Sequence, residues 1–247
     1  MFAQMEGNKR FELKYRISYL SYLKVRNTVG SYMKKDYYTK KAKGKGYLVR
    51  SLYYDTYDYK SYHEKMSGDC DRIKFRIRTY ENCLNEDTPV RVELKVRKAN
   101  TMEKYSTFVK ADELKYFDKN GSWENIEDPV LADFIRYRHM LDLQPKVLIE
   151  YNREGYQSRF NDDLRITFDH EVRSAHSNTL FPGNAFFKQH HRHGLILEIK
   201  FRDHQPAWLK ELVHSNGLKL IANSKFTQGI QVARQDLHHP GGVVVVR

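Results

Sequence analysis

Four short segments alternate charged residues with apolar residues, and this alternation limits the folds that the chain can adopt. They read RFELK at 10–14, KFRIR at 74–78, RVELK at 91–95 and LEIK at 197–200. Successive side chains of a β-strand point to opposite faces, so each segment would carry its charges on one face and its apolar groups on the other. Because Lys and Arg dominate the polar faces, we predict one shared surface or lumen that holds a highly charged anion.

An antiparallel sheet often has one solvated polar face, so a single strand of this kind also has an ordinary explanation. Solvated faces usually carry more Thr, Ser, Gln and Glu than this chain has at these positions. Arg76 and Arg78 occur two residues apart, and Arg91, Lys95 and Arg97 repeat the pattern. Neighbouring like charges repel unless an anion or interleaved carboxylates neutralise them. The arginine-rich faces therefore favour a binding surface.

The secondary-structure pattern predicts an α+β fold. We expect strands over 9–16, 47–55, 71–80, 89–98, 103–110, 146–157, 164–172 and 195–201, and helices over 18–33, 58–66, 111–119, 129–143, 206–216 and 224–235, with an exposed loop at 40–46. If the apolar strand faces turn outward to meet amphipathic helices, the sheet closes with its polar faces inward. The expected architecture is an antiparallel β-barrel tunnel with a polar, cationic lumen and helices packed on its outside.

Length and charge restrict the remaining possibilities. The 247 residues carry a formal net charge of +12, which indicates an anionic partner such as nucleic acid, an anionic membrane surface or a small polyphosphate. The length fits a single domain over 1–247 with a flexible tail at 238–247. Cys70 and Cys83 are the two cysteines, too few for a disulfide framework or a Cys-based zinc site.

The sequence also indicates where the protein is found and whether its histidines bind a metal. It has no apolar run of the roughly 18 residues that cross a bilayer, and residues 1–9 lack a signal-peptide core, so we expect a cytoplasmic protein. The histidines at 190, 191 and 193 lack the regular ligand spacing of a metal site, and we expect them to be solvated.

Several segments together resemble a known family. They are, in chain order, RFELKY at 10–15, SLYYD at 51–55, KFRIR at 74–78, ELK at 93–95, YNR at 151–153, LRITFD at 164–169, LEIK at 197–200 and SKF at 224–226. With these segments the chain resembles the VTC-type polyphosphate polymerase catalytic domain, within the CYTH-like triphosphate tunnel metalloenzyme superfamily. The resemblance spans almost the whole chain.

Two positions depart from the patterns of this superfamily. Its hydrolase and cyclase branch opens with two glutamates and a lysine in alternation, whereas this chain has Arg10 at the first position, followed by Glu12 and Lys14. That difference favours the polymerase branch. The second departure is Val96-Arg97 after Lys95, where a Thr-His pair is typical of the polymerase domains, and it bears on substrate details and turnover.

The resemblance implies a set of site residues. It implies catalytic roles for Arg76, Arg78, Lys95, Arg153 and Arg165, phosphate or nucleotide binding by Lys14, Lys74, Tyr151, Lys200, Ser224 and Lys225, and Mn²⁺ or Mg²⁺ binding by Glu198, with Glu12 and Glu93 as further candidates. Arginine suits this role because its planar fork donates two hydrogen bonds to one phosphate. Other readings stay open: Tyr151 as a core aromatic, Ser224 as a helix cap, and Glu12 and Glu93 as neutralising partners of nearby cations.

The implied function is that of a metal-dependent polyphosphate polymerase, which transfers the γ-phosphoryl group of ATP to a growing inorganic polyphosphate chain and releases ADP. The implied partners are ATP and polyphosphate, and a separate membrane protein would serve export. A triphosphate or tripolyphosphate hydrolase on the same scaffold and a noncatalytic polyphosphate binder remain alternatives. We do not expect a nucleic-acid partner, because the tyrosines are scattered and no RNA-binding motif occurs.

Overall fold

The computed structural model describes residues 11–44, 46–99, 101–124, 126–160, 163–192 and 194–233. Arg10, His193 and the predicted flexible tail at 238–247 lie outside these residues. The described chain is α+β, as predicted. Its helices are α1 (Tyr19–Tyr32), α2 (Tyr37–Lys41), α3 (Lys60–Ser67), α4 (Ala111–Asn120), α5 (Pro129–Leu141), α6 (Ala207–Ser215) and α7 (Lys225–Ala233).

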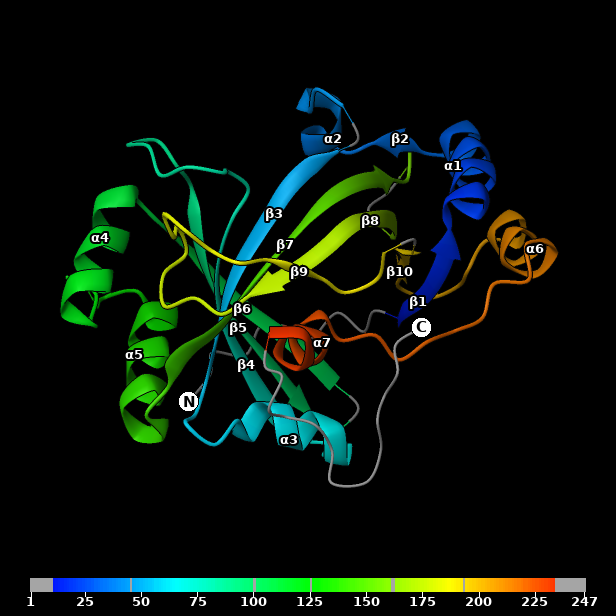
Figure 1. Cartoon of the computed structure of the whole chain (residues 1–247). Coiled ribbons are helices and arrows are strands. Elements are labelled where there is room, and N and C mark those ends of the chain that lie inside the picture. The colour runs from blue at the N-terminus through cyan, green and yellow to red at the C-terminus, as the bar shows by residue number, and fades with distance from the viewer. Residues whose placement is uncertain are drawn as a thin grey trace.

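The strands form one antiparallel sheet (Figure 1). They are β1 (Phe11–Ser18), β2 (Lys34–Lys35), β3 (Tyr47–Asp55), β4 (Arg72–Thr79), β5 (Val90–Lys98), β6 (Thr101–Val109), β7 (Gln144–Gln157), β8 (Leu164–Ala175), β9 (Lys188–Gln189) and β10 (Gly194–Phe201). The order across the sheet is β1-β10-β8-β7-β3-β4-β5-β6, with β2 paired to β7 and β9 to β8. Each adjacent pair is antiparallel, as predicted.

The sheet is a curled trough, and the predicted closed barrel is wrong. Within the described residues no ladder joins β1 to β6. The edge of β1 is occupied by the chain before α7, where Tyr15 bridges Leu220 and the amide of Ile221 donates to the carbonyl of Lys14 at 2.8 Å. The trough nevertheless curls enough for Nζ of Lys95, on β5, to lie 3.8 Å from a carboxylate oxygen of Glu12, on β1.

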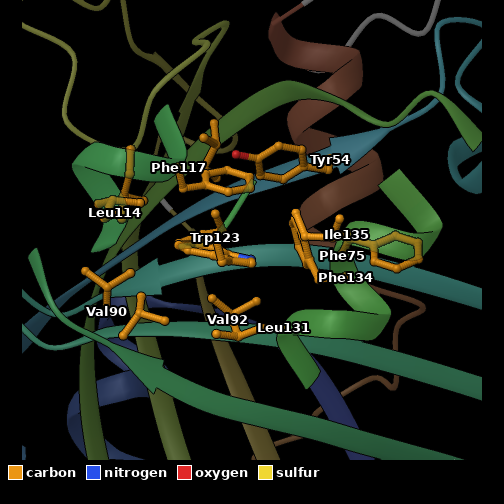
Figure 2. Close-up of a cluster of buried hydrophobic side chains, with 14 of the residues drawn as sticks. Tyr54, Phe75, Val90, Val92, Leu114, Phe117, Trp123, Leu131, Phe134 and Ile135 are labelled. Atoms are coloured by element: carbon orange, nitrogen blue, oxygen red, sulfur yellow. The ribbon is translucent and has the colours of Figure 1, made fainter. Parts of the chain in front are cut away.

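Four helices cover the convex face of the trough. Figure 1 shows α4 and α5 at one end of the sheet and α1 and α6 at the other. Under α4 and α5 lies a cluster of buried aromatic and aliphatic side chains (Figure 2) that includes Tyr54, Phe75, Phe117, Trp123 and Phe134. A second buried cluster joins α1 and α6 to β1, β8 and β10. The apolar faces of the strands therefore point outward to helices, as the alternation predicted.

Helix α7 packs on the concave face, contrary to the prediction that all helices lie outside. Phe226 and Ile230 of α7 join a buried cluster with Tyr53, Ile149 and Tyr151. The close approach needs a glycine at 229, because a Cβ there would lie 2.8 Å from Cδ1 of Ile149 and 2.9 Å from Oγ of Ser174. A helix inside the trough narrows the lumen and places the start of α7 against the polar strand faces.

Local signals explain most of the boundaries. Ser18 caps α1 by accepting a hydrogen bond from the amide of Ser21, at the predicted start of this helix. Asp142 adopts a left-handed conformation that ends α5, so β7 begins at Gln144, before the predicted start. The predicted loop at 40–46 begins inside α2, a five-residue helix capped by Asp36. Such a short helix has no periodic apolar pattern to reveal it.

No helix among the described residues is both long enough and apolar enough to cross a bilayer.

The cluster under α5 generates a stability prediction. Phe134 is fully buried and its ring meets those of Tyr54 and Phe75 at centroid distances of 5.3 and 6.0 Å. Phe134→Ala should lower the free energy of unfolding by about 3–5 kcal/mol in denaturant titrations, because truncation leaves a cavity. Met140→Ala on the same helix is the control, since Met140 is exposed and the change should stay within about 0.5 kcal/mol. A cost below about 1 kcal/mol for Phe134→Ala would contradict this packing.

Candidate functional site

A cavity of about 410 Å³ opens on the concave face, between the strands and the start of α7. Of the described residues that line it, two are carboxylates, Glu12 and Glu198, and eleven are cations. The cations are Lys14, Lys65, Arg72, Lys74, Arg76, Arg78, Lys95, Arg97, Arg153, Lys200 and Lys225. The lining is therefore strongly cationic, as the alternating segments predicted.

The pairing of β4 with β5 places cations opposite one another on one wall of the cavity. Arg72 lies opposite Arg97, Lys74 opposite Lys95, and Arg76 opposite Glu93. Directly opposed like charges repel, and burial adds the cost of removing them from water. Burial, followed by the charges of Arg72 and Lys95, lowers the pKa of Lys74 to about 7. Burial also lowers the pKa of Lys95 to about 8, against the opposing effect of Glu12.

A buried carboxylate, Glu93, holds the arginines of this wall. It accepts a hydrogen bond from Nε of Arg76, lies 2.9 Å from Nζ of Lys104 and 3.8 Å from Nε of Arg78. Burial would raise the pKa of Glu93, but the neighbouring cations, led by Arg76 and Arg78, hold it far below its usual value. Glu93 is therefore a permanent anion behind the cavity wall and does not itself line the cavity.

The hydroxyl of Tyr53 also helps to fix Arg76, from which it accepts a hydrogen bond at 2.9 Å. Burial would raise the pKa of Tyr53, but Arg76 and Arg78 outweigh burial and lower it.

A second fully buried carboxylate, Asp169, holds the opposite wall. It accepts hydrogen bonds from Nε and a terminal nitrogen of Arg153 at 2.6 and 2.9 Å, and lies 2.5 Å from Nζ of Lys225. Burial would raise the pKa of Asp169, but Arg153 and Lys225 hold it well below its usual value. Both cations keep their charge for the same reason, since Asp169 raises the pKa of each against the effect of burial.

The two lining carboxylates lie at the β1–β10 pairing. Lys14 is 2.7 Å from Oε1 of Glu12 and 3.9 Å from Oε1 of Glu198, and Lys200 is 3.2 Å from the same Glu198 oxygen. Arg153 donates to the other Glu198 oxygen at 3.2 Å. Burial would raise the pKa of Glu198, but Lys200, a hydrogen bond with Glu12, Lys14 and Arg153 keep it well below its usual value.

These carboxylates fit a divalent cation. Mg²⁺ and Mn²⁺ take oxygen ligands, and Mg²⁺ is commonly held by one or two carboxylates and completed by water and substrate phosphates. Glu12 and Glu198 supply that number of carboxylates at one cavity wall. Within the described residues, no group of three or more His, Cys, Asp or Glu side chains could hold a metal on its own. The donor set thus suits an ion shared with a phosphate ligand.

The cavity lining includes twelve of the fourteen predicted site residues, Glu93 and Arg165 being the other two. Arg165 is half-exposed and pairs with Asp36 at 3.0 Å, so the structure does not bring it to this cavity.

The sequence left two roles open for Tyr151, a core aromatic or a ligand-binding residue, and the structure is compatible with both. Tyr151 is a buried core aromatic, and it also lines the cavity beneath Arg153 and Lys225.

Ser224 likewise caps a helix and lines the cavity, the two roles that the sequence left open. Its hydroxyl accepts a hydrogen bond from the amide of Thr227 at the start of α7, and another from Nζ of Lys74 at 3.1 Å.

Among the polar residues of the site, sequence reasoning gave no role to Tyr53, Lys65, Arg72 or Asp169, and it placed Arg97 on an arginine-rich strand face without counting it among the site residues. The alternation itself could have assigned Arg72 and Arg97, because each lies two residues from a predicted site lysine on the same strand. Asp169 stood in a family segment, but no pattern marked it as the partner of two cations. The expectation that the histidines are solvated is wrong for His190, which is buried and bonded to Oγ of Ser174 at 2.6 Å.

Comparison with known proteins decides the family. The model of the VTC domain matches residues 9–234. The chain belongs to the VTC domain family. This confirms the resemblance found in the sequence. No curated protein sequence matches this VTC domain significantly.

Solved structures share the fold of this VTC domain. A proposed adenylyl cyclase from Hippeastrum with a dominant triphosphatase activity superposes with a TM-score of 0.54 at 14% identity, covering 94% of this chain and 100% of that chain. A proposed adenylate cyclase from Bacillus halodurans superposes with a TM-score of 0.52 at 13% identity, covering 86% and 92%. At these identities the likeness establishes the fold.

The buried Asp169 generates a prediction with a definite pH dependence. Asp169→Asn should lower the free energy of unfolding by about 3–5 kcal/mol at neutral pH, because it leaves Lys225 buried without its anion and Arg153 with Glu198 alone. A depressed carboxylate pKa stabilises the fold above the unfolded value of 3.8, and that stabilisation is lost as the pH falls towards about 2. The gap between wild type and variant in denaturant titrations should shrink over this window.

Asp133→Asn is the matched control for this change. Asp133 pairs with Arg136 at 2.7 Å on the surface of α5, so its loss should cost less than about 1 kcal/mol. Equal costs for the two variants, or a gap for Asp169→Asn that does not depend on pH, would show that Asp169 does not act as a buried anion.

Proposed function

We propose that this VTC domain is a metal-dependent polyphosphate polymerase that transfers the γ-phosphoryl group of ATP to a growing polyphosphate chain and releases ADP. The observation that carries the proposal is the cavity lined by eleven cations, several of them held in place by buried carboxylates. Membership of the VTC domain family supports the substrate class.

The fixed cations suit phosphoryl transfer. Such a reaction depends mainly on positioning and on stabilising the charge that spreads over the transferred group. Arg76 and Arg153 are held by Glu93 and Asp169 before any ligand arrives, so little reorganisation is needed at the reacting centre. Their guanidinium groups stay charged and keep N–H donors beyond those that bind these partners, so they can donate to a phosphate. We assign these arginines, with Arg78 and Lys225, to the transferred γ-phosphate.

The transfer itself needs no strong general base. A terminal phosphate oxygen of the growing chain, already ionised at neutral pH, attacks the γ-phosphorus of ATP. The bond from that phosphorus to the β–γ bridging oxygen breaks, and ADP leaves with the bonding electrons on that oxygen. Lys14, Lys95 and Lys200 would reduce the repulsion between the two polyanions, since all three line the same cavity.

A divalent cation belongs to the proposal, with Glu198 and Glu12 as its protein ligands. When bound, it would supply charge neutralisation at the phosphate oxygens of the donor. We assign Glu93 instead to orienting Arg76 and Arg78, because it contacts both of these lining arginines, and Lys104, from behind the lining. Arg165 lies with Asp36 away from the cavity and has no role in the proposed transfer.

A triphosphate hydrolase is the second candidate. The Hippeastrum protein of the same fold has a dominant triphosphatase activity, and the lining carboxylates could orient a water molecule. The polymerase is favoured by Arg10, which stands where the hydrolase branch has its first glutamate.

The deciding measurement follows labelled phosphate from γ-labelled ATP. Purified protein is incubated with Mn²⁺ or Mg²⁺, with and without a short polyphosphate primer, and the products are separated by gel electrophoresis. We expect a ladder of long anionic products together with ADP, because the acceptor is a phosphate chain. Free phosphate without a ladder would transfer the assignment to a hydrolase. Tight polyphosphate binding without any turnover would leave a binding module.

Glu198 provides a test of the metal assignment. Glu198→Gln should reduce metal-dependent turnover by about 100-fold or more, because a metal ion supplies several kcal/mol of charge stabilisation. Calorimetry should show that the variant still binds tripolyphosphate in the absence of metal. Glu86→Gln is the control, since Glu86 is exposed on a loop. Full activity of Glu198→Gln would remove Glu198 from the metal site.

The lowered pKa of Lys74 predicts that the binding of a phosphate chain depends on pH. Lys74 is charged below its pKa of about 7 and neutral above it, and a bound polyanion should restore the charge. Binding of long-chain polyphosphate near pH 8 should therefore take up a proton, seen by calorimetry in buffers of different ionisation enthalpy, and affinity should fall by up to about tenfold per pH unit above 7 through this group.

Lys74→Arg should show a smaller proton uptake and a weaker pH dependence, because arginine stays charged. Protons taken up or released by the phosphate chain itself are the same for wild type and Lys74→Arg, so they cancel when the two values of proton uptake are subtracted. Lys119→Arg, on the exposed end of α4, should behave as wild type. Equal proton uptake by wild type and Lys74→Arg would show that Lys74 does not titrate on binding.

A further inference from the structure

The cations of the cavity fall into two groups by their partners. Seven lie within 4 Å of a carboxylate: Lys14, Arg76, Arg78, Lys95, Arg153, Lys200 and Lys225. The other four have no described carboxylate within that distance, and they are Lys65, Arg72, Lys74 and Arg97. We call these four the rim cluster.

The rim cluster comes from adjoining ends of three elements. Arg72 is the first residue of β4, Arg97 lies next to the last residue of β5, and Lys65 is in the last turn of α3. All members are half-buried and line the cavity. Lys74 lies two residues further along β4, beside the inner cations. The cluster therefore extends the cationic lining outward from the arginines that Glu93 and Asp169 hold.

The rim cluster is electrostatically unfavourable as it stands. Arg72 and Arg97 are direct cross-strand partners, a position at which like charges destabilise a sheet. Arg72 donates to the carbonyl of Asp69, and Nε of Arg97 donates to the carbonyl of Ala99 at 3.1 Å, so neither side chain forms an ion pair. The carboxylates of Glu64 and Asp69 offset only part of the repulsion at Arg72. Burial, then Arg97, lowers the pKa of Arg72, and burial, then Arg72, lowers that of Lys65. A bound polyanion would remove this cost.

We propose that Lys65, Arg72, Lys74 and Arg97 form a second phosphate-binding site, which holds the acceptor polyphosphate chain while the inner cations hold the donor triphosphate. This inference rests on the proposed function. The inner cations are fixed by buried carboxylates, as stabilisation of a transferred group requires. The rim cations are half-buried and have no ion pair that fixes them, so they can adjust to successive phosphates of a chain that extends out of the cavity.

The test compares the binding of a short and a long phosphate chain. Wild type should bind long-chain polyphosphate more tightly than tripolyphosphate, because the longer chain reaches the rim cluster as well as the inner cations. The double variant Arg72→Gln/Arg97→Gln should lose about tenfold or more in affinity for the long chain, since it loses two sets of charge-assisted hydrogen bonds. Its affinity for tripolyphosphate should stay within about twofold of wild type.

Two further variants control this comparison. Arg136→Gln/Arg159→Gln removes the same net charge from two exposed arginines outside the cavity lining and should keep the preference for long chains. Arg72→Lys/Arg97→Lys keeps the charges and should restore most of the preference. Circular dichroism and melting temperatures establish that each variant is folded before its affinities are compared.

Other outcomes would overturn the proposal. An equal loss of affinity for both ligands would make the rim part of a single triphosphate site, and an unchanged preference for long chains would remove it from phosphate binding. Because the readout is binding, it is independent of turnover. If the double variant loses the preference for the long chain but wild type makes no polymer in the γ-labelled ATP assay, the rim site is upheld and the polymerase proposal is overturned. If wild type makes polymer but the double variant keeps that preference, the polymerase proposal is upheld and the rim site is overturned.

Discussion

The fixed ion pairs between buried carboxylates and lumen cations are the interaction on which the rest of the site depends. Glu93 and Asp169 are almost fully buried, and between them they contact cations on β4, β6, β7 and α7. Buried charges are tolerated only where partners compensate the loss of water. The two carboxylates therefore allow arginines and a lysine to stay charged inside the fold and to keep one orientation.

The curled sheet and α7 make this arrangement possible. Curling brings β1 opposite β5, so that Glu12 approaches Lys95 from the far side of the trough. Helix α7 enters the trough with Gly229 against the sheet, which leaves Lys225 beside Asp169 and Ser224 beside Lys74. The cavity is thus lined by the concave faces of the strands, by residues 220–224 and by the start of α7, and the rim cluster lies where β4, β5 and α3 meet.

Much of the fold could be predicted because its signals are local. Alternation of charged and apolar residues marked the main strands, and the helices predicted from residues 18 and 129 begin where Ser18 caps α1 and Pro129 opens α5. The closed barrel and the position of α7 were predicted wrongly, because both depend on which segment reaches the edge of β1. Several segments far from β1 in the sequence could pair with this edge. In the structure residues 220–221 occupy it, and Ile221 donates a hydrogen bond to the carbonyl of Lys14.

The sequence by itself determined the family, the antiparallel α+β architecture and most of the cationic lining, since these follow from side-chain periodicity and residue type. Tertiary structure alone decided which cations have anionic partners. It placed Asp169 with Arg153 and Lys225, paired Arg165 with Asp36, and left Arg72 opposite Arg97 without an ion pair. The physical reason is that charge pairing depends on distances of a few ångströms between residues far apart in the chain.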